Sequence, residues 1–337
     1  MDVPRFYVSG GSLTNGDNVD TLHLLSRMRE GLLGPLVSTV TLLAPPSSQY
    51  VQSTANADDW DSILLSAVNA EEITLHNPPP RVLLNAPASI LSMNVQRLSL
   101  HSRDRAGLHR VIYTFSRTIN SLLLNIHGMA PNEPTFHPAL DPTAFLTKLT
   151  TLRVAVNSKT IGLLMESCRF PHLSRLRLHV DNAPQDLTLE MVMDLLSSLP
   201  SSLNELEVTG KYAADETSML PLPSWVNAIP CITKVTAPFN LIKKGIDLTA
   251  SGPSHVSCVN VLLDVEAGKW GLVKNTLTAG KLKIGEWKLG DNCVVQLVTG
   301  FGWTKCDDWS VPSEHRDYET QRVFPADDSR STYLLAV

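Results

Sequence analysis

The chain reads LTTLRVAV at residues 149–156, LSRLRLHV at 173–180 and LNELEVTG at 203–210. In each string, apolar side chains stand at positions i, i+3 and i+5. This spacing recurs every 24 to 33 residues, with first positions at Val37, Ala70, Val95, Ile119, Leu149, Leu173, Leu203 and Ile232. A repeat of this length is typical of a solenoid, in which each unit contacts only its neighbours.

Each motif ends in residues that are apolar at every second position, as in Leu176, Leu178 and Val180. This alternation predicts a strand with one buried face. Between the strands, apolar residues follow the spacing of an amphipathic helix, as in Ile161, Leu164, Met165 and Cys168. The repeated strand and helix predict an α/β solenoid, or horseshoe, with a parallel sheet on its concave face and helices on its convex face.

Local signals add two expectations. Asp141 and Pro142, just before Phe145, predict a helix start, because aspartate caps helices and proline suits their first turn.

Weaker copies of the motif begin at Val256 and Ile284. We therefore predict an N-terminal segment or cap at 1–30, a solenoid at 31–245, degenerate repeats or a C-terminal cap at 246–310, and a polar tail at 311–337.

Composition narrows the class of protein. The net charge is −5 over 337 residues, whereas nucleic-acid-binding domains usually carry a basic excess. No apolar run reaches the roughly 18 to 20 residues that span a bilayer, and the first 18 residues lack the pattern of a signal peptide. The five cysteines are scattered, which favours reduced thiols in a cytoplasmic or nuclear protein.

The strings LTTLRVAV, FPHLSRLRLHV and PSSLNELEVTG resemble leucine-rich repeats, and Phe170 to Leu178 is similar to the repeat region of fungal F-box-type proteins. In that family the solenoid recognises a target, and an N-terminal F-box docks on a cullin ubiquitin ligase. No F-box helix pattern precedes residue 20. The family often has asparagine eight residues after the first leucine. Asn157 holds this place after Leu149, but Arg103, Asp181 and Lys211 hold it after Val95, Leu173 and Leu203.

Polar residues alternate with the buried ones and are expected on the concave face. The candidate binding residues are Arg97, His101, Arg153, Arg175, Arg177, His179, Glu205 and Glu207. One interpretation is a basic surface that binds an acidic peptide, because arginine forms bidentate bonds with carboxylates. The other is that Arg175 and Arg177 pair with Glu205 and Glu207 on the adjacent strand, which is an ordinary arrangement of surface charges.

No catalytic or metal-binding motif stands beside the repeat. Cys168 and His172 are four residues apart, but no second pair with ligand spacing follows them. A nucleophile built from Cys306, His315 and Asp317 would need residues that no pattern brings together. We therefore expect no cofactor, no metal and no enzymatic activity.

The sequence predicts a non-enzymatic protein–protein interaction module that recognises a protein partner, such as an acidic peptide, through its concave face. We expect it to bind neither nucleic acid nor membrane. The resemblance implies one alternative, a substrate receptor of a cullin-type ubiquitin ligase whose F-box is lost or lies on a separate adaptor chain. A second alternative is an enzyme, most plausibly a hydrolase, with dispersed catalytic residues.

Overall fold

The chain forms two compact units in a computed structural model, Met1–His172 and Leu173–Val337. The structure describes residues 6–9, 37–43, 54–78, 82–83, 94–102, 108–126, 143–181, 189–211, 226, 228–229, 231–238, 246–247, 255–263, 287–288, 294–300 and 318–325.

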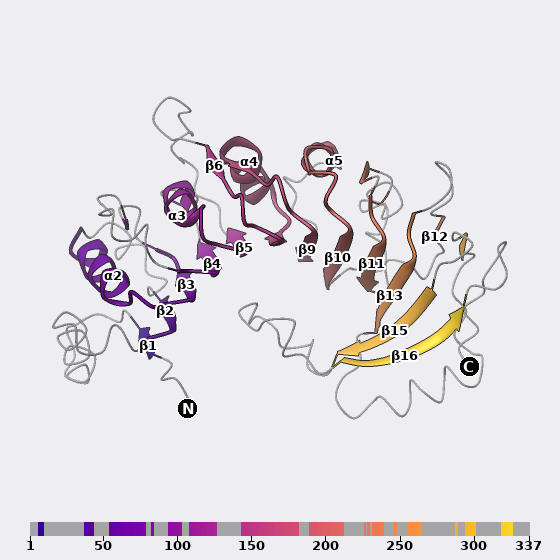
Figure 1. Cartoon of the computed structure of the whole chain (residues 1–337), viewed down its shortest axis with the longest axis horizontal. Coiled ribbons are helices and arrows are strands. Elements are labelled where there is room, and N and C mark those ends of the chain that lie inside the picture. Colours follow the sequence, from indigo (N-terminus) through magenta and orange to yellow (C-terminus); the bar gives the residue numbers. More distant parts are fainter. Residues whose placement is uncertain are drawn as a thin grey trace. The chain divides into compact units, whose positions relative to one another are not determined.

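The N-terminal unit contains a parallel sheet whose neighbouring strands follow one another along the chain (Figure 1). Its strands are β1 (Phe6–Ser9), β2 (Thr39–Leu43), β3 (Glu72–His76), β4 (Arg97–Ser102), β5 (Ser121–Ile126) and β7 (Thr151–Ala155). Each pair is parallel. The prediction of an α/β fold with parallel strands is confirmed for this unit.

The C-terminal unit repeats the arrangement. Its parallel strands are β9 (Arg175–Asp181), β10 (Glu205–Lys211), β11 (Lys234–Pro238), β13 (Cys258–Leu263) and β15 (Val294–Gly300). A final strand, β16 (Tyr318–Pro325), pairs with β15 in the antiparallel sense.

The apolar positions of the motif fall on the same register in successive strands. Across β2 to β7 the i+3 residues are consecutive partners, and so are the i+5 residues. The first row is Val40, Ile73, Leu98, Leu122 and Leu152, and the second is Leu42, Leu75, Leu100, Leu124 and Val154. In β9, β10 and β11 the i+3 row is Leu176, Leu206 and Val235. All of these residues are buried, which confirms the predicted core positions.

One carbonyl at the start of each strand links each repeat to the next. The oxygen of Ser38 accepts the N–H groups of Glu71 and Glu72 at 2.8 and 3.2 Å. The same double acceptance, at 2.8 to 3.1 Å, is found at Glu71, Gln96, Asn120, Ser174, Asn204 and Thr233. Every one of these acceptors directly follows the first apolar residue of its motif, so the sequence repeat is also a repeat of backbone hydrogen bonds.

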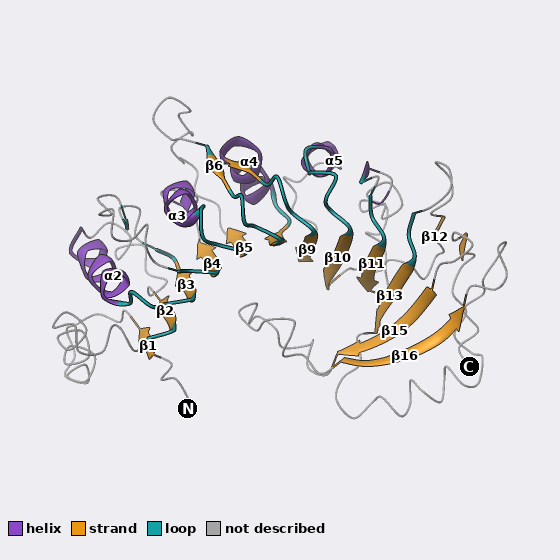
Figure 2. Ribbon diagram, in the orientation of Figure 1, coloured by secondary structure: helices purple, strands orange, loops and turns teal. Residues whose placement is uncertain are grey.

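Helices alternate with the strands. In the N-terminal unit α2 (Thr54–Ser66), α3 (Leu108–Phe115) and α4 (Ser158–Ser167) lie on one side of the sheet (Figure 2). The C-terminal unit contains α5 (Leu189–Ser197). Helix α4 buries Ile161 and Leu164 as predicted, whereas Cys168 follows the helix in a short strand.

Asn157, at the position that the repeat resemblance singles out, joins α4 to β5. Its Oδ1 accepts the N–H of Thr160 at 2.9 Å and caps the helix, while its Nδ2 donates to the carbonyl of Ile126 at 2.9 Å. One side chain therefore satisfies a free helical N–H group and a carbonyl of the preceding repeat.

The prediction of a helix that begins just before Phe145 is wrong. Ala144–Phe145 forms strand β6, which pairs in parallel with β8 (Cys168–Arg169). The N–H of Leu146 donates to the carbonyl of Arg169 at 2.9 Å, so a tertiary partner fixes this backbone and overrides the local signal. Asp141 and Pro142 lie outside the described residues.

Two further expectations concern the C-terminal part. The weak copy at Val256 is confirmed, because it leads into β13. The copy at Ile284 does not continue this sheet: β14 (Trp287–Lys288) pairs with β12 (Ile246–Asp247) in a separate sheet. Strand β15 takes the place beside β13 instead, because Val295 and Leu297 match the apolar partners Val259 and Val261.

Within the segment 311–337, predicted as a polar tail, residues 318–325 form β16. Ladder hydrogen bonds come from the backbone, so the polar composition of this segment does not prevent it from pairing with β15.

Replacing Leu176 with alanine is expected to lower the free energy of unfolding by about 2–5 kcal/mol, because the leucine is fully buried and faces its register partner Leu206. Urea titration followed by circular dichroism measures the change. Ser201→Ala, in an exposed turn, is the control and should change stability by less than about 0.5 kcal/mol. Equal midpoints for the two variants would contradict the stacked core.

Replacing Asn157 separates its capping hydrogen bond from those that its Nδ2 donates to the carbonyl of Ile126 and, at 3.4 Å, to that of Ala155. Asn157→Ala loses all of them and should destabilise the protein by about 0.5–2 kcal/mol through the cap alone, and by more through the bond to Ile126. Asn157→Asp keeps the capping acceptor but loses the donor, so its midpoint in the same urea titration should fall between those of the wild type and the alanine variant. An aspartate variant as stable as the wild type would mean that the bond to Ile126 contributes nothing.

Candidate functional site

The candidate site is the polar sheet face, which we define as the strand residues that alternate with the buried apolar rows. Parallel pairing aligns these residues as well. In the C-terminal unit one row contains Arg175, Glu205, Lys234 and Cys258, the next contains Arg177, Glu207, Thr236 and Asn260, and a third contains His179 and Thr209. Adjacent strands lie about 4.8 Å apart, which places neighbours in a row within contact distance.

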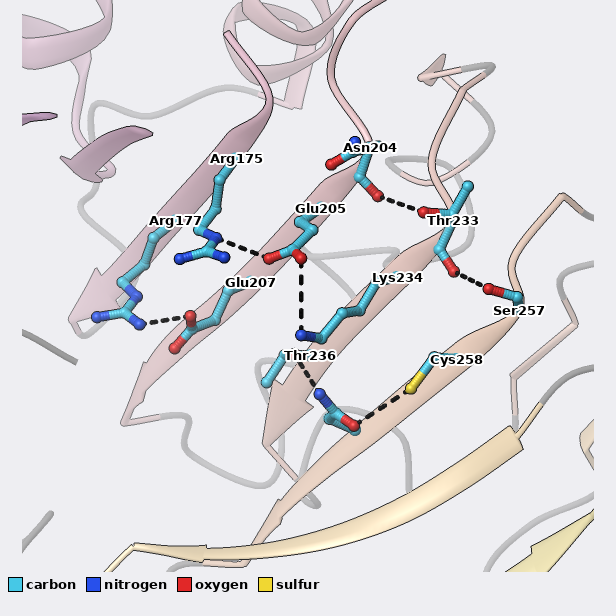
Figure 3. A network of polar contacts seen from close by, with 11 residues as sticks. Arg175, Arg177, Asn204, Glu205, Glu207, Thr233, Lys234, Thr236, Ser257 and Cys258 are labelled. Atoms are coloured by element: carbon cyan, nitrogen blue, oxygen red, sulfur yellow. Dashed lines mark hydrogen bonds and ion pairs between the residues drawn. The ribbon is translucent and has the colours of Figure 1, made fainter. Parts of the chain in front are cut away.

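Opposite charges meet along the first row (Figure 3). Nε of Arg175 lies 2.7 Å from Oε2 of Glu205, and Nζ of Lys234 lies 3.7 Å from Oε1 of the same carboxylate. The side chains of Arg175 and Lys234 are 41% and 40% exposed. This row therefore presents a positive, a negative and a second positive group to solvent in a fixed order.

The second row is more enclosed. Nη2 of Arg177 lies 2.5 Å from Oε2 of Glu207, and the two side chains are only 8% and 15% exposed. Nε of Arg177 is buried and has no hydrogen-bond partner among the described residues. A buried guanidinium requires its counter-ion, so this pair is primarily a structural element of the sheet.

Neutral hydrogen bonds continue the rows toward β13. Nδ2 of Asn260 donates to Oγ1 of Thr236 at 3.2 Å, and the thiol of Cys258 donates to Oδ1 of Asn260 at 3.4 Å. Burial raises the pKa of Cys258; Lys234 opposes this effect and Glu205 adds to it. The sulfur is therefore a neutral hydrogen-bond donor at neutral pH and a poor nucleophile.

Similar rows cross the N-terminal unit. Nε of Arg97 on β4 lies 3.2 Å from Oε2 of Glu72 on β3. Further along the same strands the rings of His76 and His101 stack, with centroids 4.4 Å apart and planes inclined by 10°. Asn125 on β5 continues this row. Its buried Oδ1 has no hydrogen-bond partner within the described part of the chain.

The predicted binding residues all lie on these strands at polar positions. Arg175, Arg177, Glu205 and Glu207 form the cross-strand pairs that the second sequence interpretation expected. His179 is hydrogen-bonded to Thr209 at 2.9 Å. In the N-terminal unit, Arg97 is ion-paired, His101 is buried in its stack with His76, and Arg153 is half-buried on β7.

Sequence reasoning missed several participants, among them Glu72, His76 and Lys234. Each stands at the offset used elsewhere for polar positions: Glu72 and His76 are two and six residues after Ala70, and Lys234 is two residues after Ile232. The same offset of polar residues from the first apolar residue could therefore have identified them in the repeats that begin with Ala70 and Ile232.

The structure also places Cys168 and His172, which stand four residues apart and were considered as metal ligands. Burial raises the pKa of Cys168 to about 12, which keeps it a thiol, and His172 is exposed. No group of three or more histidine, cysteine or acidic side chains suited to a metal ion occurs within the described ranges. Cys306, His315 and Asp317 lie outside them.

Comparison with protein-family models, with curated proteins and with solved structures found no match to this chain. None of the helices in the described ranges combines the length and the apolar character needed to cross a bilayer.

The two ion-paired rows predict different costs of removing one carboxylate. Glu207→Ala should destabilise the protein by about 3–5 kcal/mol, because it leaves a buried guanidinium without its counter-ion. Glu205→Ala, in the exposed row, should cost about 0–1 kcal/mol. Chemical denaturation of both variants checks the difference, and equal losses would show that burial does not distinguish the two rows.

Proposed function

We propose that this chain is a non-enzymatic protein-binding module, built as a leucine-rich-repeat-like solenoid, that recognises a protein partner through its polar sheet face. Two features support the solenoid. The apolar rows keep one register within each unit, and a carbonyl at the same motif position accepts two N–H groups in successive repeats. Asn157 adds a side-chain bond between repeats.

The observation that carries the proposal is the row Arg175, Glu205 and Lys234. Its charges alternate in sign, are partly exposed, and are held in place by mutual ion pairs. Charged side chains on a surface usually move freely, and binding a partner costs them conformational entropy. Side chains already held by ion pairs have lost part of that entropy before binding, so the cost of binding is smaller. Such a row favours specificity for a partner with the complementary order of charges.

The alternating charges of this row call for a different partner from the acidic peptide expected from the sequence. A purely acidic peptide would meet Glu205 and Glu207 as well as the arginines, and like charges brought together oppose binding. We therefore propose a partner surface that carries both signs, with a negative, a positive and a negative group spaced to match three adjacent strands.

A charge-inverted variant tests this proposal without removing the ion pairs. In Arg175→Glu/Glu205→Arg/Lys234→Glu every neighbour in the row remains oppositely charged, but the order presented to a partner is reversed. Partners are captured from native cytosol by the wild type and by the variant, and are compared quantitatively. We expect a specific protein to be enriched by the wild type and to be lost by at least about tenfold with the inverted variant.

The matched control is Ser197→Glu/Ser201→Glu, which makes the same net-charge change of −2 at two exposed residues of this unit outside the strands. The captured protein is then purified and its affinity for all three forms is measured. Equal binding by the wild type and the inverted variant, with unchanged thermal unfolding, would overturn recognition by this row.

A further inference from the structure

The N-terminal unit carries a second charged surface on the side of its helices. Arg110, Tyr113 and Arg117 stand three and four residues apart on α3 and the turn that follows it, so they occupy one helical face. The opposite face of α3 is buried through Leu108, Val111, Ile112 and Phe115. Tyr113 is 44% exposed although it is aromatic.

Strand β6 adds a second aromatic residue beside α3. The two elements are in contact, and Figure 1 shows β6 close to α3 and α4. Phe145 is 61% exposed, while its neighbours Ala144 and Leu146 are buried. Its register partner on β8 is Arg169, whose guanidinium donates to the carbonyls of Met165 and Cys168.

Glu166, three residues before Arg169 at the end of α4, is acidic and exposed, but the charged side chains that we assign to this surface are all positive. Its members, which we call the basic aromatic patch, are Arg110, Tyr113, Arg117, Phe145, Lys148 and Arg169. Residues 108–120, 143–150 and 168–172 contain no aspartate or glutamate, although the whole chain has a net charge of −5. Within the part of the chain that the structure describes, the side chains of Arg110, Arg117 and Lys148 make no hydrogen bond or ion pair.

The contrast with the polar sheet face indicates the chemistry of the partner. On the sheet face Arg97, Arg175, Arg177 and Lys234 already have carboxylates from neighbouring strands. On the patch, Arg110, Arg117 and Lys148 have no carboxylate partner among the described residues, and the exposed rings of Tyr113 and Phe145 belong to α3 and to the adjoining strand β6. Arginine and tyrosine are the residues that most often dominate protein interfaces, and arginine binds carboxylates in a bidentate manner.

We propose that the basic aromatic patch binds an acidic segment of another protein that places an apolar anchor residue between its carboxylates. The anchor would cover Tyr113 and Phe145, and the carboxylates would pair with the arginines and Lys148. We prefer such a segment to a nucleic acid or an anionic membrane because the chain as a whole carries a net charge of −5 and because the patch includes two exposed aromatic side chains. This patch lies apart from the polar sheet face, so the two proposals stand or fall independently.

Fluorescence anisotropy of labelled peptides tests the proposal on the full chain. The probe is a peptide with three glutamates on each side of a leucine–phenylalanine pair, and the matched peptide has glycine–serine in place of that pair. We expect the first peptide to bind at least about tenfold more tightly than the second, and its affinity to fall between 50 and 300 mM salt.

Three variants locate the binding. Arg110→Glu/Arg117→Glu and Phe145→Ser should each weaken the anchored peptide at least about tenfold, and Arg110→Gln/Arg117→Gln should weaken it less than the reversal. The matched control, Arg97→Glu/Glu72→Arg on the polar sheet face of the same unit, should bind like the wild type.

Several results would overturn the proposal. These are failure of the wild type to bind the anchored peptide, equal binding by the patch variants while their thermal unfolding is unchanged, or tighter binding to phosphatidylserine vesicles or single-stranded DNA than to the peptide.

Discussion

The backbone register between consecutive repeats is the constraint on which the rest of the structure depends. In each unit one carbonyl accepts the first two N–H groups of the next repeat, so each parallel strand begins at the same motif position. Leucine then faces leucine across strands, as Leu98 faces Leu122 and Leu176 faces Leu206. Complete burial of one such side chain contributes roughly 1.5–3 kcal/mol, and no single repeat can achieve it alone.

The same register creates the polar sheet face. Because the motifs at Leu173 and Leu203 are 30 residues apart, Arg175 meets Glu205 and Arg177 meets Glu207 at the identical separation. Polar residues therefore acquire partners by the mechanism that builds the core. The sheet face becomes a set of ordered, largely neutralised rows. On the helix side, where no such register operates, Arg110 and Arg117 have no carboxylate partner among the described residues.

The sequence was sufficient to predict elements whose pattern is repeated. The apolar rows, the parallel pairing and the positions of the polar residues followed from the i, i+3, i+5 spacing, and β13 followed from a weak copy at Val256. Helix α2 could also have been predicted, because Trp60, Ile63, Leu64 and Ala67 have helical spacing and are buried.

Elements fixed by one tertiary contact were not predictable: β6 depends on a bond to Arg169, and β16 depends on backbone pairing with β15. The sequence alone also could not predict which cations lack a carboxylate partner, because that depends on the ion pairs formed in the folded chain.

A double-mutant cycle on the apolar row of the C-terminal unit tests the register most directly. Leu176→Ala and Leu206→Ala remove register partners, while Leu176→Ala and Val259→Ala remove residues three strands apart in the same row. Stacked repeats predict a coupling of about 0.5–3 kcal/mol for the first pair, and additivity within about 0.5 kcal/mol for the second. Additive losses for Leu176 and Leu206 would contradict the register on which the polar sheet face depends.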